Sequence, residues 1–313
     1  MFPSSNKRAL RRLLAILASL PVVALTLSTA PGRAAETSVS ASPAVRFTVT
    51  VRGTGPDVIL IPGLASSAHV WDAAAARLEG HYRLHLVQVS GFAGTPAGPN
   101  ASGPVIQPLV DSIAAYIDAR RLKQPAIIGH SLGGLVGLML AVQHSDKVGR
   151  LMIVDSLPWY GAAVAGPTAT PAMIQPQAAA LRDSVVGESQ EAYAASELMA
   201  MARLVKSDGP EAHAALAAAV ASDHRVVGHA TYDDLMTDLR ARLSEVRAPV
   251  TVLYPWDAAT GAPESAIDAF YTGAFAGLPG AKVHRVDGAF HFLMIDQPDA
   301  FAREVDGFLA GAR

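Results

Sequence analysis

Three residues that follow apolar runs have the types needed for nucleophilic catalysis: Ser131, Asp257 and His291. A serine hydroxyl is a weak nucleophile at neutral pH, so an imidazole has to remove its proton. The imidazole needs a carboxylate that fixes its tautomer and stabilises its protonated form. Side chains that follow the strands of an open α/β sheet meet at the carboxyl edge of the sheet, so these three residues are expected to converge there.

Ser131 lies in Gly129-His130-Ser131-Leu132-Gly133, which matches the pattern G-x-S-x-G. The apolar run 126–128 before it predicts a short buried strand, and apolar residues at helical spacing from Leu135 to Val142 predict a helix after it. Glycines lack a Cβ and suit a crowded strand-to-helix turn with the serine at its apex. The alternative interpretation is an ordinary glycine-rich turn.

The loop 62–67 follows an apolar strand predicted over 58–61 and precedes a helix predicted over 68–78. A backbone N–H in this loop can point toward the same edge of the sheet as Ser131. We therefore predict that the amides of Leu64 and Leu132 form an oxyanion hole, because fixed N–H groups stabilise charge that develops on a substrate oxygen. Taken alone, the loop is equally a plain strand-to-helix connection.

Rival residues exist for the carboxylate and for the substrate pocket. Asp155 also follows a buried strand, over 151–154, and is the alternative acid. Four residues are candidates for lining the substrate pocket, although core packing explains the aromatic ones equally well: His69, His130, Trp256 and Phe292. The ten histidines form no convincing metal-ligand set, and no metal or cofactor is predicted.

Strands and helices alternate over most of the chain, which indicates a doubly wound, mostly parallel α/β sheet. The core is predicted in two parts, residues 45–157 and 245–313, the first of which opens with a half-exposed edge strand. Residues 158–244 contain almost no strand-like run and are rich in alanine. They predict an inserted helical cap over the active-site end of the sheet.

With these motifs the chain resembles the α/β-hydrolase superfamily, and within it the cap-bearing serine hydrolases that include carboxylesterases and lipases. The resemblance covers residues 47–308 and depends on Pro62-Gly63-Leu64, the G-x-S-x-G pattern, Trp256-Asp257 and Gly288-Ala289-Phe290-His291. It implies Ser131 as the nucleophile, Asp257 as the acid and His291 as the general base, without a cofactor. Many members have His-Gly where this chain has Pro62-Gly63, and Asp where it has Ser90.

The expected activity is hydrolysis of small or medium apolar carboxylic esters through an acyl-enzyme. The apolar preference is a hypothesis from methionines in the predicted cap, which adapt to varied apolar groups. Acyl transfer, lactone opening and C–C bond hydrolysis share the same motifs and stay open. A non-catalytic binding protein on the same scaffold is the alternative from another class.

The N-terminus has the order of a secretory signal peptide: cationic residues up to Arg12, an apolar run over 13–27 and small residues at Gly32 and Ala34. Removing residues 1–34 leaves 20 Lys and Arg against 27 Asp and Glu, a net charge of −7, with a flexible leader predicted over 35–44. That charge argues against nucleic acid or an anionic membrane surface as the main partner. The chain has no cysteine and hence no disulfide.

We expect an exported protein, periplasmic or secreted, that has no stable membrane anchor after cleavage and acts on a small-molecule ester. The exported form should begin near Ala35, because cleavage after Ala34 places small residues at the two positions that signal peptidase reads. Intact-mass analysis of protein from the export fraction checks this. Retention of residues 1–34 there would contradict the prediction.

Overall fold

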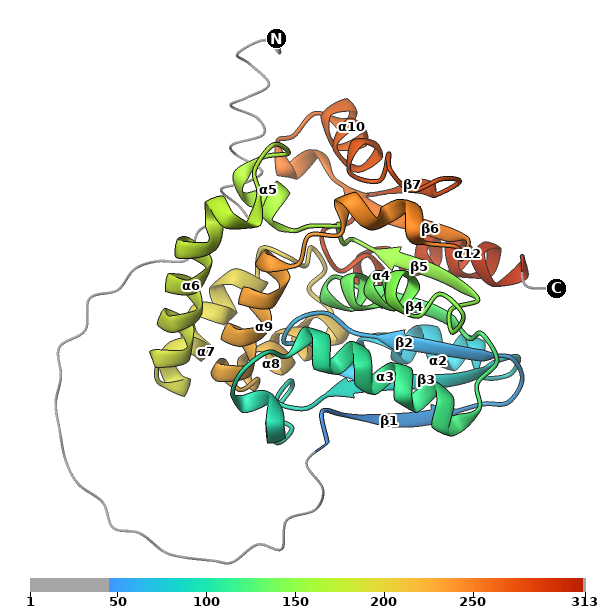
Figure 1. The fold of residues 1–313 in the computed structure, drawn as a ribbon, viewed down its shortest axis with the longest axis horizontal. Coiled ribbons are helices and arrows are strands. Elements are labelled where there is room, and N and C mark those ends of the chain that lie inside the picture. Colours follow the sequence, from blue (N-terminus) through green and yellow to red (C-terminus); the bar gives the residue numbers. More distant parts are fainter. Residues whose placement is uncertain (1–44, 312–313) are drawn as a thin grey trace, which may run out of the picture.

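The computed structural model describes residues 45–311 of the 313-residue chain (Figure 1). The predicted signal peptide and leader, residues 1–44, lie outside the described residues. None of the described helices is both long enough and apolar enough to cross a membrane.

A seven-stranded sheet forms the centre of the molecule, in the order β1-β3-β2-β4-β5-β6-β7. β1 is antiparallel to β3 at one edge, and all other neighbours are parallel. The central strands are almost continuously apolar and buried, as required of a parallel sheet covered on both faces. The predicted fold class is confirmed. The strands are β1 (Phe47–Arg52), β2 (Asp57–Ile61), β3 (Arg83–Val89), β4 (Ala126–His130), β5 (Arg150–Val154), β6 (Val250–Trp256) and β7 (Lys282–Asp287).

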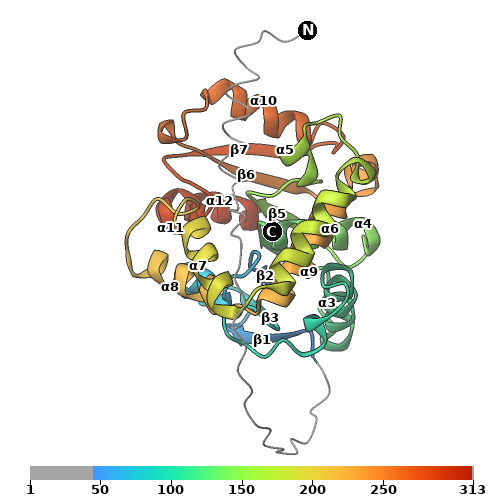
Figure 2. The ribbon, with the colours of Figure 1, turned by 90° about the vertical axis from the view of Figure 1, so that its left-hand side faces the viewer.

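Helices cover both faces of this sheet. Figure 2 shows α3 and α4 on one side of it and α11 and α12 on the other. The helices of the two layers are α2 (Asp72–Leu78), α3 (Ile106–Arg120), α4 (Leu132–Gln143), α10 (Glu264–Ala274), α11 (Leu293–Asp296) and α12 (Pro298–Ala310). Short 3₁₀ helices complete the connections: η1 (Ala68–Trp71), η2 (Gly98–Ala101), η3 (Arg240–Glu245) and η4 (Ala258–Thr260).

Five helices and η3, with no strand, lie between β5 and β6: α5 (Gly161–Ala165), α6 (Pro171–Gly187), α7 (Gln190–Met201), α8 (Pro210–Val220) and α9 (His224–Met236). We call α5–α9 the cap. Figure 1 shows α6–α9 gathered at one end of the sheet. The cap contacts the loop after β3, where the Asp223 amide donates to the Gly91 carbonyl at 2.7 Å and the Ala93 amide to the Ser222 hydroxyl at 2.8 Å. The cap therefore borders the carboxyl ends of the strands.

The turn between β4 and α4 has no room for side chains at its two flanking glycines. A Cβ on Gly129 would lie 2.1 Å from the Gly133 carbonyl oxygen, and one on Gly133 would lie 2.2 Å from the Ile61 carbonyl oxygen. Between them Ser131 has a φ of 51° and a ψ of −122°, a conformation that L-residues rarely adopt. Close packing of backbone on backbone thus forces the serine to the apex, as the glycine pattern predicted.

Replacing Gly129 by Ala should lower the free energy of unfolding by about 1–3 kcal/mol or more, because backbone atoms have to move to admit the methyl group. Gly307→Ala is the matched control: nothing lies within 4 Å of its added Cβ, in the middle of α12. There the same substitution should stabilise the protein by about 0.5–1 kcal/mol through helix propensity. Urea unfolding of both variants measures the two changes, and equal shifts would contradict this account of the turn.

Candidate active site

Ser131 stands at the N-terminus of α4 and is half-buried, so its hydroxyl remains accessible. Its own amide is used structurally, donating to the Val154 carbonyl on the neighbouring strand at 2.9 Å. The dipole of α4 favours negative charge at this end of the helix.

His291 is paired with Asp155. The Nδ1 atom of His291 lies 2.6 Å from Oδ2 of Asp155, and the two side chains are 20% and 11% exposed. The other carboxylate oxygen, Oδ1, accepts a hydrogen bond from the Tyr271 hydroxyl. Burial, followed by the charge of Asp155, raises the pKa of Tyr271, so the phenol stays protonated and able to donate. A carboxylate held in this way fixes the imidazole with Nδ1 protonated and Nε2 free.

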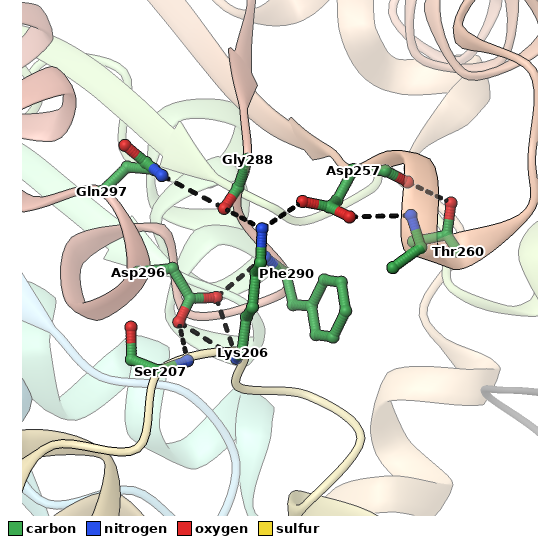
Figure 3. A network of polar contacts seen from close by, with 9 residues as sticks. Lys206, Ser207, Asp257, Thr260, Gly288, Phe290, Asp296 and Gln297 are labelled. Atoms are coloured by element: carbon green, nitrogen blue, oxygen red, sulfur yellow. Dashed lines mark hydrogen bonds and ion pairs between the residues drawn. The ribbon is translucent and has the colours of Figure 1, made fainter.

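The expectation that Asp257 pairs with His291 is wrong. The Asp257 carboxylate accepts from Lys206 Nζ at 2.6 Å and from the Ala259 amide at 2.7 Å (Figure 3). The hydrogen bond from Lys206 is the main cause that lowers the pKa of Asp257, followed by the Ala259 amide. Asp257 therefore forms its ion pair with Lys206 of the cap and not with His291.

Strand order explains why Asp155 is the partner. β5 lies directly beside β4, in a register that places His130 opposite Val154, so Asp155 follows at the level of Ser131. β6, which ends before Asp257, is one strand farther away. Asp155 has a φ of 45°, a left-handed conformation in which aspartate is more common than most residues.

His130 packs against His291 and holds it in place. Its ring is fully buried, its Nε2 lies 3.0 Å from the His291 carbonyl, and the two ring centroids are 4.5 Å apart. Burial, followed by the charge of His291, lowers the pKa of His130, which keeps it neutral with Nε2 as the donor. Phe292 is buried against the His130 ring at 4.8 Å. Both residues position His291 and do not present an open surface to a substrate.

The other two pocket candidates are not brought to the site. The His69 side chain is 81% exposed and pairs with Asp72. Trp256 donates from its indole Nε1 to the Ala262 carbonyl at 3.1 Å, and the Arg285 guanidinium lies 5.5 Å from its ring centroid. Neither forms a hydrogen bond or ring contact with Ser131, Asp155 or His291 within residues 45–311.

The loop after β2 lies against the serine. A Cβ on Gly63 would be 3.0 Å from both Ser131 Cβ and His130 Nδ1, so only glycine fits here without displacement. Next to it, the amide of Leu64 donates to no acceptor among residues 45–311, and the same holds for the amide of Leu132 at the first position of α4. Two unused N–H groups thus flank the Ser131 region, as an oxyanion hole requires.

Sequence reasoning missed Asp296, at the end of α11. Its carboxylate accepts from the amides of Phe290 (2.8 Å), Ser207 (2.8 Å) and Lys206 (3.0 Å), which Figure 3 shows as one network. Asp296 therefore fixes the loop that carries His291 and joins it to the cap segment 206–207. No motif marks this residue, since its partners are backbone groups and two of them lie 89 and 90 residues away in the sequence.

No hydrogen bond joins Ser131 Oγ to His291 among the described residues. Such contacts are often long in the absence of substrate and tighten when the substrate binds. Within residues 45–311 no cluster of three or more His, Asp or Glu side chains could hold a metal ion. A serine at the apex of the turn, an imidazole oriented by a carboxylate and two free amides are the groups that acyl transfer by a serine nucleophile requires.

Comparison with known proteins places this geometry in a family. The model of the alpha/beta hydrolase family matches residues 58–304. The pimeloyl-[acyl-carrier protein] methyl ester esterase of Vibrio vulnificus is 36% identical over 111 residues, which cover 36% of this chain and 41% of that protein. The match thus spans well under two thirds of this relative's length.

Two solved structures share the fold over most of their length. A thermophilic esterase from Thermogutta terrifontis superposes with a TM-score of 0.69 at 18% identity, covering 85% of this chain and 93% of that one. The enol-lactonase from Burkholderia xenovorans gives a TM-score of 0.66 at 20% identity, covering 84% and 96%. The match to the family model covers most of the sheet, the loop of Gly63, the turn of Ser131 and the loop of His291. The chain therefore belongs to the α/β hydrolase family.

Proposed function

We propose that this protein is a serine esterase that hydrolyses small or medium carboxylic esters. The observation that carries the proposal is the 2.6 Å contact between His291 Nδ1 and Asp155 Oδ2, beside the strained Ser131 turn. The name of the Vibrio vulnificus relative, an ester-cleaving enzyme, supports the same bond type.

In the proposed reaction Ser131 Oγ attacks the ester carbonyl carbon while His291 Nε2 takes the hydroxyl proton. Asp155 stabilises the imidazolium that forms, and the amides of Leu64 and Leu132 bind the oxyanion. The C–O bond to the alcohol then breaks, and His291 returns the proton to the leaving oxygen. Water activated by His291 hydrolyses the acyl-serine and releases the acid.

The expected apolar preference loses part of its basis. Met173 and Met199 of the cap are 65% and 64% exposed, and Met201 is buried in the core. The first two lie at the surface and the third is packed, so none is shown as an acyl-binding wall. We keep the size range as a proposal. We also propose that the protein acts outside the cytoplasm, on the strength of the N-terminal pattern alone.

Ser131→Ala should lower kcat on p-nitrophenyl esters by at least about 10⁴-fold, because removing the nucleophile leaves only binding and oxyanion stabilisation. The assay uses esters from acetate to palmitate, with circular dichroism to verify the fold of the variant. The chain-length profile of the native protein measures the size preference. Equal rates in the two proteins would contradict the proposed function, and lactones and acyl acceptors would then be tested.

Asp155→Asn should lower kcat by about 10⁴-fold, since an amide leaves the imidazole in the wrong tautomer and its cation without a counter-charge. Asp257→Asn is the matched control, with the same change of charge at the end of the next strand. It should alter kcat by less than about fivefold, because the Asp257 carboxylate contacts Lys206 and the Ala259 amide and neither member of the His291–Asp155 pair. A larger loss in Asp257→Asn than in Asp155→Asn would restore Asp257 as the acid.

A further inference from the structure

The two carboxylates that follow β5 and β6 are held in different ways. Asp257 accepts from the Ala259 amide, two residues along the chain, at 2.7 Å. In the described part of the chain no backbone amide donates to the Asp155 carboxylate. Its hydrogen bonds come from side chains, with His291 on Oδ2 and Tyr271 on Oδ1. The orientation of the Asp155 carboxylate therefore depends on elements outside its own turn.

Tyr271 lies on α10, which packs against β6 and β7 (Figure 1). One turn earlier in the same helix, the Asp268 carboxylate pairs with the Arg285 guanidinium of β7, with contacts of 2.8 and 2.9 Å. The Tyr271 ring is stacked on the Tyr254 ring of β6, with the centroids 4.4 Å apart and the planes 13° from parallel. The ion pair and the stacked rings together hold the Tyr271 hydroxyl in place at the end of β5.

Rotation of the Asp155 carboxylate is the freedom that this hydrogen bond restricts. The last torsion of an aspartate has broad energy minima, so the backbone alone does not aim the carboxylate oxygens. The hydrogen bond from Tyr271 to Oδ1 leaves Oδ2 directed at His291 Nδ1, 2.6 Å away. The Asp155 side chain is only 11% exposed, so water is poorly placed to replace the phenol as the donor. Tyr271 thus provides at the end of β5 the donor that a backbone amide provides at the end of β6.

We propose that Tyr271 is a positioning residue, which holds Asp155 in the orientation that lets His291 accept the proton of Ser131. The inference rests on the proposed function, because it adds Tyr271 to the serine–histidine–aspartate mechanism. Within the described residues the Tyr271 hydroxyl forms no hydrogen bond with Ser131 or His291, so it acts through the carboxylate. Loss of the hydroxyl should therefore slow the chemical step and leave substrate binding unchanged.

Tyr271→Phe tests this role, because it removes the hydroxyl and keeps the ring that stacks on Tyr254. The kcat for p-nitrophenyl butyrate should fall about tenfold or more, but by less than in Asp155→Asn, and KM should change by less than about twofold. A kcat that is unchanged in Tyr271→Phe would overturn the proposal. A fall in kcat/KM caused by KM alone would overturn it too.

Tyr254→Phe is the matched control, since it removes the hydroxyl of the other ring in the same stack. That hydroxyl donates to Asp268 at 2.8 Å, and Asp268 keeps its contacts with Arg285 in the variant. The kcat of Tyr254→Phe should therefore change by less than about twofold. Equal falls of kcat in the two variants would contradict a specific role of the Tyr271 hydroxyl. Circular dichroism and urea unfolding verify that both variants are folded under the assay conditions.

The hydrogen bond between His291 and Asp155 can also be followed without a substrate. The Nδ1 proton of a histidine in a short, charge-assisted hydrogen bond to a carboxylate resonates far downfield in a proton NMR spectrum. The native protein should show such a resonance, and its absence from Asp155→Asn assigns it. In Tyr271→Phe it should move upfield or vanish, and in Tyr254→Phe it should stay in place.

This resonance separates the inference from the proposed function. A resonance that is unchanged in Tyr271→Phe, or that moves farther downfield, would overturn the positioning role even if the native protein hydrolyses esters. A resonance that requires the Tyr271 hydroxyl, in a protein that hydrolyses no ester, would uphold the positioning of Asp155 and contradict only the esterase proposal.

Discussion

The close approach of backbone to backbone around β4 governs the rest of the site. β4 is paired with a strand on each side. At its end, a Cβ on Gly129 would collide with the Gly133 carbonyl, and a Cβ on Gly133 would collide with the Ile61 carbonyl at the end of β2, so both positions accept only glycine. Ser131 is thereby lifted to the carboxyl edge of the sheet in a strained conformation. Gly63, in the loop after β2, is confined by the same serine, because a Cβ on it would lie 3.0 Å from Ser131 Cβ. Close backbone packing, rather than side-chain packing, thus sets the position of Ser131.

Local sequence patterns were sufficient to predict the fold and most of the residues of the candidate site. Continuous apolar runs marked the buried parallel strands, and the glycine spacing marked the turn, because both follow from burial and backbone sterics at neighbouring positions. The choice between Asp155 and Asp257 was different in kind. Both carboxylates follow strands, and only the spatial order of β5 and β6 beside β4 separates them. The order of strands in a sheet cannot be predicted from the periodicity of apolar residues along each strand.

Contacts between the cap and the core could not be predicted from the sequence for a similar reason, since they join residues that are far apart along the chain. Lys206 forms an ion pair with Asp257, and Asp296 accepts from the amide of nearby Phe290 and from two amides of the distant segment 206–207. Conversely, His69 and the exposed methionines drew attention by type alone, and the folded chain places them at the surface.

The network around Asp296 has a consequence for how the cap can evolve. The Leu204 carbonyl accepts from the Phe292 amide at 3.3 Å, and Lys206 and Ser207 share Asp296 with the loop of His291. Residues 204–207 of the cap thus support the loop that carries His291. Exchange of whole caps between family members would alter substrate range and loosen His291 together, unless residues 204–207 were kept with the core. A recombination boundary for this fold therefore belongs before Leu204, inside the inserted helices, and not at the start of β6.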